Sequence, residues 1–355
     1  MHIVRTAATA AITIATLALA ACSAPSPTAS PSTTASPTGD TEVTVVTHDS
    51  FAVPDDVLAA FETSTGIRVT FVAPGDAGTL TNRLILTKDA PLGDVAYGID
   101  NTFASRAAKA GVFAEYTSSM PAAAHAATYA TPDAPGLTAV DYSDVCLNYD
   151  IGYFSDHGLP VPQSFDDLLK PEYKGLLSVT NPATSSPGLA FLLATIAAKP
   201  DTWKDYWAAL AANDLRVTAS WSDTYYTDFS APNYGGDYPI VLSYASSPPF
   251  EVVDGKPTTA ALLDTCFRQV EYVGVLAGAK HPAAAQQVVD WMLSDAFQGS
   301  LPENMYVYPV STSVDIPADW AKYAPLASSP WTLDAAQIDA NRDAWIQAWT
   351  EVAQP

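Results

Sequence analysis

Aromatic residues follow two strand-like runs in the second half of the sequence. Trp221 comes after the run LRVTA, while Tyr244 and Phe250 bracket the segment Ala-Ser-Ser-Pro-Pro that follows YPIVLS. Aromatic faces attract cations, and each such contact contributes about 0.5 to 2 kcal/mol. Three rings at loop positions beside carboxylates therefore predict a box for a flat, cationic ligand. The alternative is that each ring fills part of a hydrophobic core.

A second group of polar residues lies at a predicted helix start. The segment Thr184–Gly188, with the sequence TSSPG, combines hydroxyl groups with backbone N–H groups that a helix leaves unpaired. Such a terminus suits a phosphate or another anion. Ordinary helix capping explains the same residues equally well.

Other site chemistries find little support. The five His are scattered without metal-ligand spacing, and the chain has neither a G-x-S-x-G elbow nor a P-loop. The adjacent Tyr225 and Tyr226 could bind ferric iron as phenolates, but iron needs further acidic or His ligands. Adjacent tyrosines are more often one core residue and one surface residue.

The elements that would position these residues alternate between strand and helix. Strands are expected at 41–47, 67–72 and 94–99, each followed by a helical pattern, and this rhythm predicts a parallel sheet. Ligands of such α/β sheets lie at the carboxyl ends of the strands. The loops His48–Phe51, Gly75–Gly78 and Gly98–Asn101 should therefore share one rim.

The rest of the body repeats this style and predicts two α/β lobes with a ligand cleft between them. Strands are expected at 142–149, 176–180, 215–219, 238–245 and 267–277, and helices at 188–198, 201–212, 281–294 and 334–352. The chain would cross between the lobes near residues 140 and 270. The expected division is lobe 1 at 41–140, lobe 2 at 141–268 and a return to lobe 1 at 269–355, with the last helix assignable to either lobe.

The first 40 residues indicate export. Residues 1–21 contain an apolar run that is too short to span a bilayer, which is typical of a secretory signal peptide. The segment Leu19–Cys22 resembles the lipobox of bacterial lipoproteins and predicts lipidation of Cys22; a plain signal peptide cleaved near Ala21 is the alternative. Residues 22–40 are rich in Ser, Thr and Pro, which predicts an extended tether.

Charge and cysteine content narrow the partners further. The 355 residues include 16 Lys+Arg and 38 Asp+Glu, a net charge of −22, which argues against binding nucleic acid or an anionic membrane surface. With 48% hydrophobic residues and 15% charged ones, the chain is a folded body and not a disordered polyelectrolyte. If Cys22 is lipidated, Cys146 and Cys266 remain as a pair that could form a disulfide outside the cytoplasm, or two unrelated buried thiols.

Eight stretches, in order and in register across the body, resemble the thiamine-binding periplasmic proteins, the substrate-binding components of thiamine ABC transporters. They are VTVVTHDSF (43–51), TLTNRLIL (79–86), DVAYGIDN (94–101), NPATSSPGLAFLLAT (181–195), VTASWSDTYY (217–226), VLSYASSPPF (241–250), WMLSDAFQ (291–298) and NMYVYPV (304–310). The resemblance implies the type II, two-lobed periplasmic-binding-protein fold with its ligand between the lobes.

The resemblance also implies a site. It places a carboxylate at Asp76 beside Ala77, small hydroxyl residues at Ser185 and Ser186, and aromatic walls at Trp221 and Tyr244. The full candidate set is Asp76, Ala77, Ser185, Ser186, Trp221, Tyr244, Ala245, Ser246, Ser247, Pro248, His48, Phe250 and Tyr226. The chain has His48 and Phe250 where the family commonly has Tyr. It has Ala183 where related sequences can carry Arg, which puts preference for phosphorylated thiamine in doubt.

The expected function is capture of thiamine or its phosphates by a lipid-anchored, monomeric protein on the outer face of the cell membrane. The protein would deliver the ligand to an ABC transporter permease, without a cofactor, a metal or a covalent step. Two alternatives stay open. A ferric-iron binding protein of the same fold would use Tyr225 and Tyr226, and a thiaminase-like enzyme would need Cys146 or Cys266 as a free thiol in the cleft.

Overall fold

The computed structural model describes residues 41–131 and 133–354. The predicted signal peptide, the tether and Cys22 lie outside the described residues. Within them a nine-stranded sheet is formed by β1 (Thr41–Val46), β2 (Ile67–Val72), β3 (Val95–Asp100), β4 (Thr138–Asp150), β5 (Leu177–Thr180), β6 (Arg216–Thr218), β7 (Ile240–Tyr244), β10 (Thr259–Val275) and β11 (Tyr308–Pro309). A separate hairpin pairs β8 (Val252–Val253) with β9 (Lys256–Pro257).

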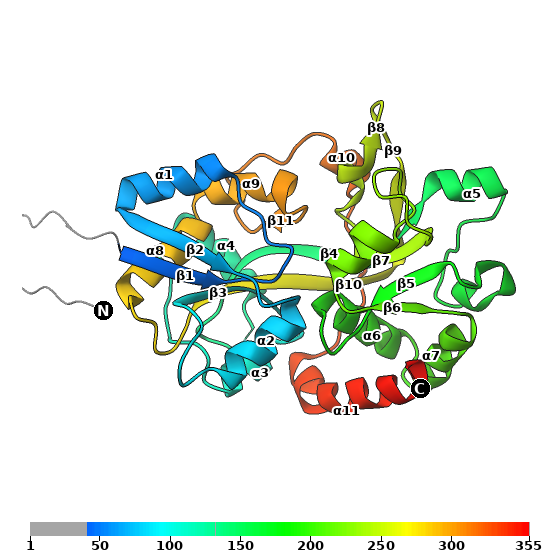
Figure 1. Ribbon diagram of the computed structural model, residues 1–355, viewed down its shortest axis with the longest axis horizontal. Helices are drawn as coiled ribbons and strands as arrows, with labels where there is room; N and C mark the ends of the chain where they lie inside the picture. The colour runs from blue at the N-terminus through cyan, green and yellow to red at the C-terminus, as the bar shows by residue number, and fades with distance from the viewer. Residues whose placement is uncertain (1–40, 132, 355) are drawn as a thin grey trace, which may run out of the picture. The chain divides into compact units, whose positions relative to one another are not determined.

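The strand order is β2-β1-β3-β10-β4-β7-β5-β6, with β11 beside β4 (Figure 1). The first three strands are parallel, as the βαβαβ pattern predicts, and β5 pairs in parallel with β6 and β7. Between these two groups, β4 and β10 run antiparallel to each other. The α/β fold with two strand groups joined by crossing segments is therefore confirmed.

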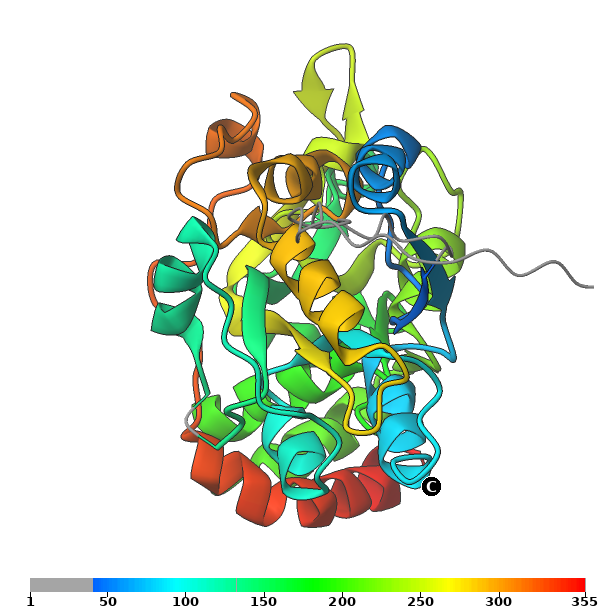
Figure 2. The ribbon, with the colours of Figure 1, turned by 90° about the vertical axis from the view of Figure 1, so that its left-hand side faces the viewer.

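The strands β1 and β3 are apolar on both faces because helices cover both. Val45 belongs to the hydrophobic cluster shared with α1 (Asp55–Thr65) and α8 (Pro282–Met292), whereas Val46 belongs to the cluster that contains α2 (Ala77–Leu86). Successive strand residues point to opposite faces, which explains this split. Figure 1 shows α1 and α8 on the other side of these strands from α2, and Figure 2 shows α8 lying across the sheet.

The two central strands are longer than the sequence predicts. β4 starts four residues before the expected 142, and β10 starts eight residues before the expected 267. Polar residues in the added segments, Asp141 in β4 and Asp264 and Thr265 in β10, interrupt the apolar pattern that marks a strand. The predicted lobe boundaries at 140 and 268 fall inside these two strands.

The remaining helices pack outside the sheet. They are α3 (Ala104–Lys109), α4 (Pro121–Ala126), α5 (Ile151–His157), α6 (Ser186–Ala198), α7 (Trp203–Ala212), α9 (Asp295–Asn304), α10 (Trp320–Tyr323) and α11 (Ala335–Ala353). The last helix contacts elements of both strand groups. Its Trp349 packs 5.5 Å from Trp207 of α7, and its Asp339 accepts a hydrogen bond from Ser105 of α3. Among the described helices, none is long and apolar enough to cross a bilayer.

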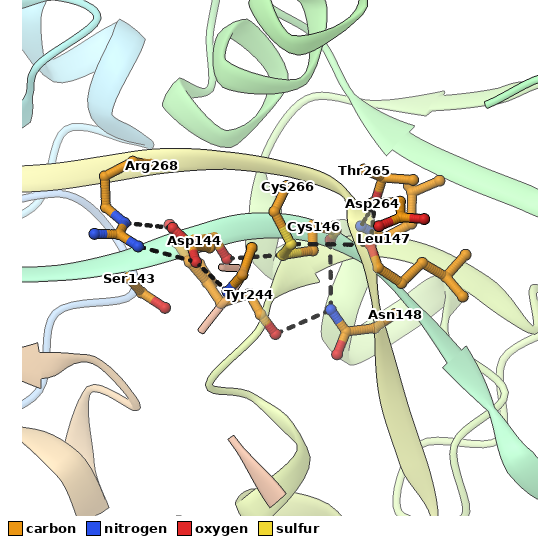
Figure 3. The surroundings of a disulfide bond; sticks show 12 residues. Ser143, Asp144, Cys146, Leu147, Asn148, Tyr244, Asp264, Thr265, Cys266 and Arg268 are labelled. Carbon is orange, nitrogen blue, oxygen red and sulfur yellow. Dashed lines mark hydrogen bonds and ion pairs between the residues drawn. A yellow bond between two sulfur atoms is a disulfide. The ribbon is translucent and has the colours of Figure 1, made fainter. Parts of the chain in front are cut away.

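A disulfide joins the two central strands, as the cysteine count suggests. Cys146 of β4 is bonded to Cys266 of β10, and both are fully buried. The bond lies where the β4–β10 register shifts between Leu262 and Phe267, so it holds a segment that ladder hydrogen bonds do not. Nearby, Arg268 forms an ion pair with Asp144 (Figure 3).

We expect removal of this disulfide to destabilise the fold. The bond links residues 120 apart in sequence, and a loop of that length restricts the unfolded chain strongly. The double variant Cys146→Ala/Cys266→Ala should lose about 2 to 5 kcal/mol of unfolding free energy, measured by denaturant titration. Wild-type protein under thiol reductant should lose a similar amount, and an unchanged unfolding midpoint in both would contradict a structural role for the bond.

Candidate functional site

A cavity of about 170 Å³ opens at the carboxyl ends of the strands. One ordered water needs only about 10–15 Å³ of such space, so the cavity has room for a larger molecule. Its lining comes from both strand groups, from the end of α9 and from the segment after it: His48, Ser50, Trp221, Tyr225, Tyr226, Tyr244, Ser247, Phe250, Glu271, Glu303, Asn304, Met305, Tyr306 and Val307. The cavity is therefore walled mainly by aromatic rings and contains two carboxylates.

Trp221 forms one wall. It follows β6 directly, and the next residues form a π-helical turn, Asp223–Asp228, which places Tyr225 under the indole. The Trp221 and Tyr225 rings stack with centroids 4.9 Å apart and an interplanar angle of 15°. The indole Nε1 donates to the Ser243 hydroxyl at 3.0 Å, and Ser243 is also bonded to Ser247. The ring is thus held from two sides.

Tyr244 and Phe250 complete the aromatic surface. Tyr244 ends β7, with its ring centroid 6.0 Å from that of Trp221. Phe250 lies in the short helical turn Pro248–Glu251, is 39% exposed, and meets Tyr306 edge-on at 4.7 Å. The structure therefore brings together the three rings that the sequence singled out, with Tyr226 and His48 beside them.

Asp76 lies behind this wall and does not line the cavity. It is the N-cap of α2 and only 6% exposed. Its carboxylate accepts hydrogen bonds from the backbone N–H of Ala77 at 2.5 Å and of Trp221 at 2.8 Å. Burial raises its pKa to about 6, even though these donors and Ser185 act in the opposite direction. Asp76 thus ties the first strand group to the loop that carries Trp221.

The hydroxyl pair Ser185 and Ser186 is also outside the cavity. Both are buried at the start of α6, and Ser186 accepts a hydrogen bond from the Gln269 side chain at 2.9 Å. The starts of α2 and α6 touch here, because the Thr79 N–H donates to the Thr184 carbonyl at 3.0 Å. Gly78 permits this approach, since a Cβ at that position would lie 2.7 Å from the Thr184 carbonyl carbon.

The predicted loop Ala245–Pro248 contributes one lining residue, Ser247. Ala245, Ser246 and Pro248 are buried beneath the cavity. The Ser246 hydroxyl donates to the Tyr306 carbonyl at 2.6 Å, so this loop supports the opposite wall.

Several lining residues were absent from the sequence-based set. They are Ser50, Glu271, Glu303, Asn304, Met305, Tyr306 and Val307, together with Tyr225, which was considered only as an iron ligand. Glu271 had a detectable signal, because it is the lone charge in the otherwise apolar run VEYVGV. Tyr306 has a φ of 53°, a conformation that nothing in its own residue type predicts.

Glu271 and His48 form a buried ion pair in the cavity lining. The His48 Nε2 lies 3.5 Å from the Glu271 Oε1, and both residues are 6% exposed. The Tyr97 hydroxyl lies 2.6 Å from an Asp141 oxygen and 3.2 Å from the other Glu271 oxygen. Glu271 and Asp141 are direct partners in the β10–β4 register. Two carboxylates and one phenol thus meet beside the cavity, and of the three only Glu271 lines it.

The two carboxylates differ in their pKa values. Burial raises the pKa of Asp141 well above its usual range, and the charge of Glu271 raises it further. Burial also disfavours the ionised form of Glu271, but His48 and the hydrogen bonds of Tyr97 and Asp141 outweigh that effect and lower its pKa. Burial would lower the pKa of His48, yet Glu271 raises it above 6.5. Folding therefore shifts the pKa values of Asp141 and Glu271 in opposite directions, and the Glu271–His48 contact favours the ionised form of both partners.

The iron-binding alternative receives no support from these residues. In the described part of the chain, no group of three or more His, Cys, Asp or Glu could hold a metal ion. Burial raises the pKa values of Tyr225 and Tyr226, and the charge of Glu251 raises both further, which disfavours the phenolates that iron would need. Tyr225 is 2% exposed and Tyr226 is 45% exposed, the core-and-surface division expected of adjacent tyrosines.

The chain matches a known protein family and has curated relatives. Residues 90–332 match the family described as bacterial extracellular solute-binding protein. The thiamine-binding periplasmic protein of Escherichia coli (strain K12) is 30% identical over 319 residues, covering 86% of this chain and 92% of that protein.

Solved structures of other binding proteins have the same fold. A periplasmic thiamin binding protein superposes with a TM-score of 0.77 at 29% identity, covering 88% of this chain and 96% of the other. A ferric binding protein from Campylobacter jejuni has a TM-score of 0.67 at 17% identity, covering 87% and 99% respectively. The latter likeness shows the fold alone.

The buried Asp100 predicts a pH-dependent stability. It is fully buried at the end of β3 and accepts two hydrogen bonds from Thr102, but burial still raises its pKa from 3.8 to about 7. A carboxyl group whose pKa is raised by folding loses its stabilising effect as the pH rises toward that value. Asp100→Asn should therefore gain stability relative to wild type at pH 8 but not at pH 4, by up to about 4 kcal/mol.

Denaturant titrations at both pH values would measure this difference. The exposed Asp201→Asn serves as the matched control, with a pH-independent difference from wild type expected. An Asp100→Asn difference that is equal at both pH values would show that folding does not raise the pKa of Asp100.

Proposed function

Because the chain belongs to the bacterial extracellular solute-binding protein family, we propose that it captures thiamine outside the cytoplasm and delivers it to the permease of an ABC transporter. The aromatic cavity carries this proposal. Its lining residues come from both strand groups, as expected of a cleft that closes on a solute.

The cavity chemistry matches the chemistry of thiamine. The thiazolium ring is a fixed cation and the pyrimidine is a flat ring, so both can stack on aromatic faces. Trp221, Tyr244 and Phe250 supply such faces in the cavity, and Glu271 supplies a negative charge. Binding of this kind needs no covalent step, and we infer that the protein is not an enzyme. The thiol that a thiaminase-like reaction needs is held in the Cys146–Cys266 disulfide.

The residues behind the walls have a supporting role in this proposal. Asp76 and Ala77 begin α2, while Ser185 and Ser186 begin α6, at the point where the two strand groups touch. We propose that Asp76 acts on the ligand through Trp221, whose backbone N–H it binds. A phosphate at Ser185 and Ser186 would require these two helix starts to separate, so we propose free thiamine as the preferred ligand.

The location follows from the first 40 residues. We propose that Cys22 carries a lipid anchor and that residues 22–40 form a tether which lets the monomeric body reach the permease on the outer face of the cell membrane. A Pro-rich tether of this kind reaches about 3.1 Å per residue. Anchoring by lipid removes any need for basic charge at the membrane surface.

Replacement of Trp221 should weaken thiamine binding. Trp221→Ala removes the largest aromatic face and should raise the dissociation constant at least about tenfold, which is roughly 1.4 kcal/mol. Trp221→Phe keeps a ring and should lose less. Titration calorimetry with thiamine, thiamine monophosphate and thiamine pyrophosphate measures all three proteins.

The matched control is Trp345→Ala, which removes an indole from α11, far along the chain from the cavity lining. It should bind thiamine as wild type does. The absence of binding heat with all three ligands in the wild-type protein would overturn the proposed function, whereas unchanged affinity in Trp221→Ala would remove only this residue from the site.

Replacement of Cys22 should release the protein from the membrane. Cys22→Ala leaves no thiol for lipidation, so the exported protein should appear in the soluble extracytoplasmic fraction instead of the membrane fraction. Fractionation followed by immunoblotting checks this, with Cys146→Ala/Cys266→Ala as a control that keeps Cys22. A variant that stays in the membrane fraction would contradict anchoring through Cys22.

A further inference from the structure

The following inference rests on the proposed function and concerns the charge chemistry of the same cavity. We propose that Glu271 is the carboxylate that balances the bound cation, and that His48, which pairs with Glu271 in the structure, releases its proton when the cation binds. Capture would then exchange one positive charge for another, and affinity would depend on pH.

Glu271 is the buried carboxylate that reaches the cavity. The buried acidic side chains of this region include Asp76, Asp100, Asp141 and Glu251, none of which lines the cavity, whereas Glu271 does. Glu303 also lines it, but Glu303 is exposed on α9, where water weakens its attraction for a cation. A cation between the aromatic walls would therefore interact most strongly with Glu271.

His48 is the cation that Glu271 already has. Within residues 41–131 and 133–354, the ion pair of Glu271 is with His48, and no Lys or Arg is paired with it. On its other side Glu271 meets Tyr97, a hydrogen-bond donor without charge, and Asp141, whose pKa is raised well above its usual range by burial. The cavity floor thus carries one negative charge with one titratable partner.

The titratable and hydrogen-bonding groups around the His48 ring come from separate segments of the chain. Glu271 of β10 lies at its Nε2, and the Ser50 hydroxyl lies 2.9 Å from its Nδ1. Tyr97 of β3 has its ring centroid 5.8 Å away, and Asp76 and Asp49 act on the imidazole through their charges. The acidic neighbours all stabilise the imidazolium, and a cation that competes for Glu271 would weaken this stabilisation.

Glu271 has a similarly complete set of neighbours. Besides His48, Tyr97 and Asp141, its charge acts on Asp100 and on Tyr244. Asp76 and Asp100, with pKa values of about 6 and about 7, are the other groups that could release protons in the same range. The test must separate them from His48.

The sign of the effect follows from linkage. Without a ligand, Glu271 holds the pKa of His48 above 6.5. A fixed cation beside Glu271 repels the imidazolium and lowers that pKa. Between the two pKa values, binding releases a proton to solvent, so thiamine affinity should rise with pH by up to about tenfold per unit. Above the pKa of the free protein, affinity should level off.

Calorimetry of thiamine binding in two buffers with different ionisation enthalpies counts the released protons. At pH 6.5, below the raised pKa of His48, wild type should release up to one proton per thiamine. His48→Gln keeps an N–H donor near Glu271 but cannot carry a charge, so its proton release should vanish and its affinity should vary little with pH. His157→Gln, on the exposed α5, is the matched control and should behave as wild type does.

Glu271→Gln tests the other half of the proposal. It keeps the size of the side chain and one acceptor oxygen but removes the negative charge, and circular dichroism checks that the variant is folded. Its thiamine affinity at pH 8 should fall at least about tenfold. Wild-type affinity in this variant would overturn the role of Glu271.

Three other results would contradict parts of the proposal. Proton release by His48→Gln equal to that of wild type would overturn the role of His48. Loss of the release in Asp76→Asn or Asp100→Asn, but not in His48→Gln, would assign it to those carboxyl groups instead. Failure of wild type to bind thiamine at any pH would overturn the proposed function itself, a result distinct from binding that is independent of pH.

Discussion

The antiparallel pairing of β4 with β10 is the constraint on which the other parts of the structure depend. These two strands join the parallel group β2-β1-β3 to the group β7-β5-β6. Their register sets Asp141 opposite Glu271 and Asp144 opposite Arg268. The disulfide between Cys146 and Cys266 holds the same pair of strands where the ladder is interrupted. Any change in this register would move both the cavity floor and the lobes.

The shape of the cavity comes mainly from uncharged aromatic side chains, and its buried charge comes from the Glu271–His48 pair. Trp221 is fixed through its backbone by Asp76 and through its indole by Ser243, so its ring needs little ordering when a ligand arrives. The net charge of −22 favours the approach of a cation, but salt screens such a field beyond about 8 to 10 Å. Selectivity must therefore come from the rings and from Glu271.

How far the sequence predicts the structure depends on the range of each interaction. The strands β1, β2 and β3 are predicted within one residue because continuous apolar runs mark them locally. The aromatic wall is also predicted, since each ring follows a recognisable strand. The true starts of β4 and β10 were missed because polar residues there, such as Asp141 and Thr265, find partners on other strands.

The sequence by itself determined the α/β class, the order of the elements and the rings available for a cationic ligand, because propensity and periodicity are properties of neighbouring residues. Only the tertiary structure decided which carboxylate faces the cavity. Asp76 follows a strand, as a ligand-binding residue of this fold should, yet its oxygens are taken by backbone N–H groups. Glu271 reaches the cavity because strand register and burial, which involve residues far apart in the chain, set it beside His48.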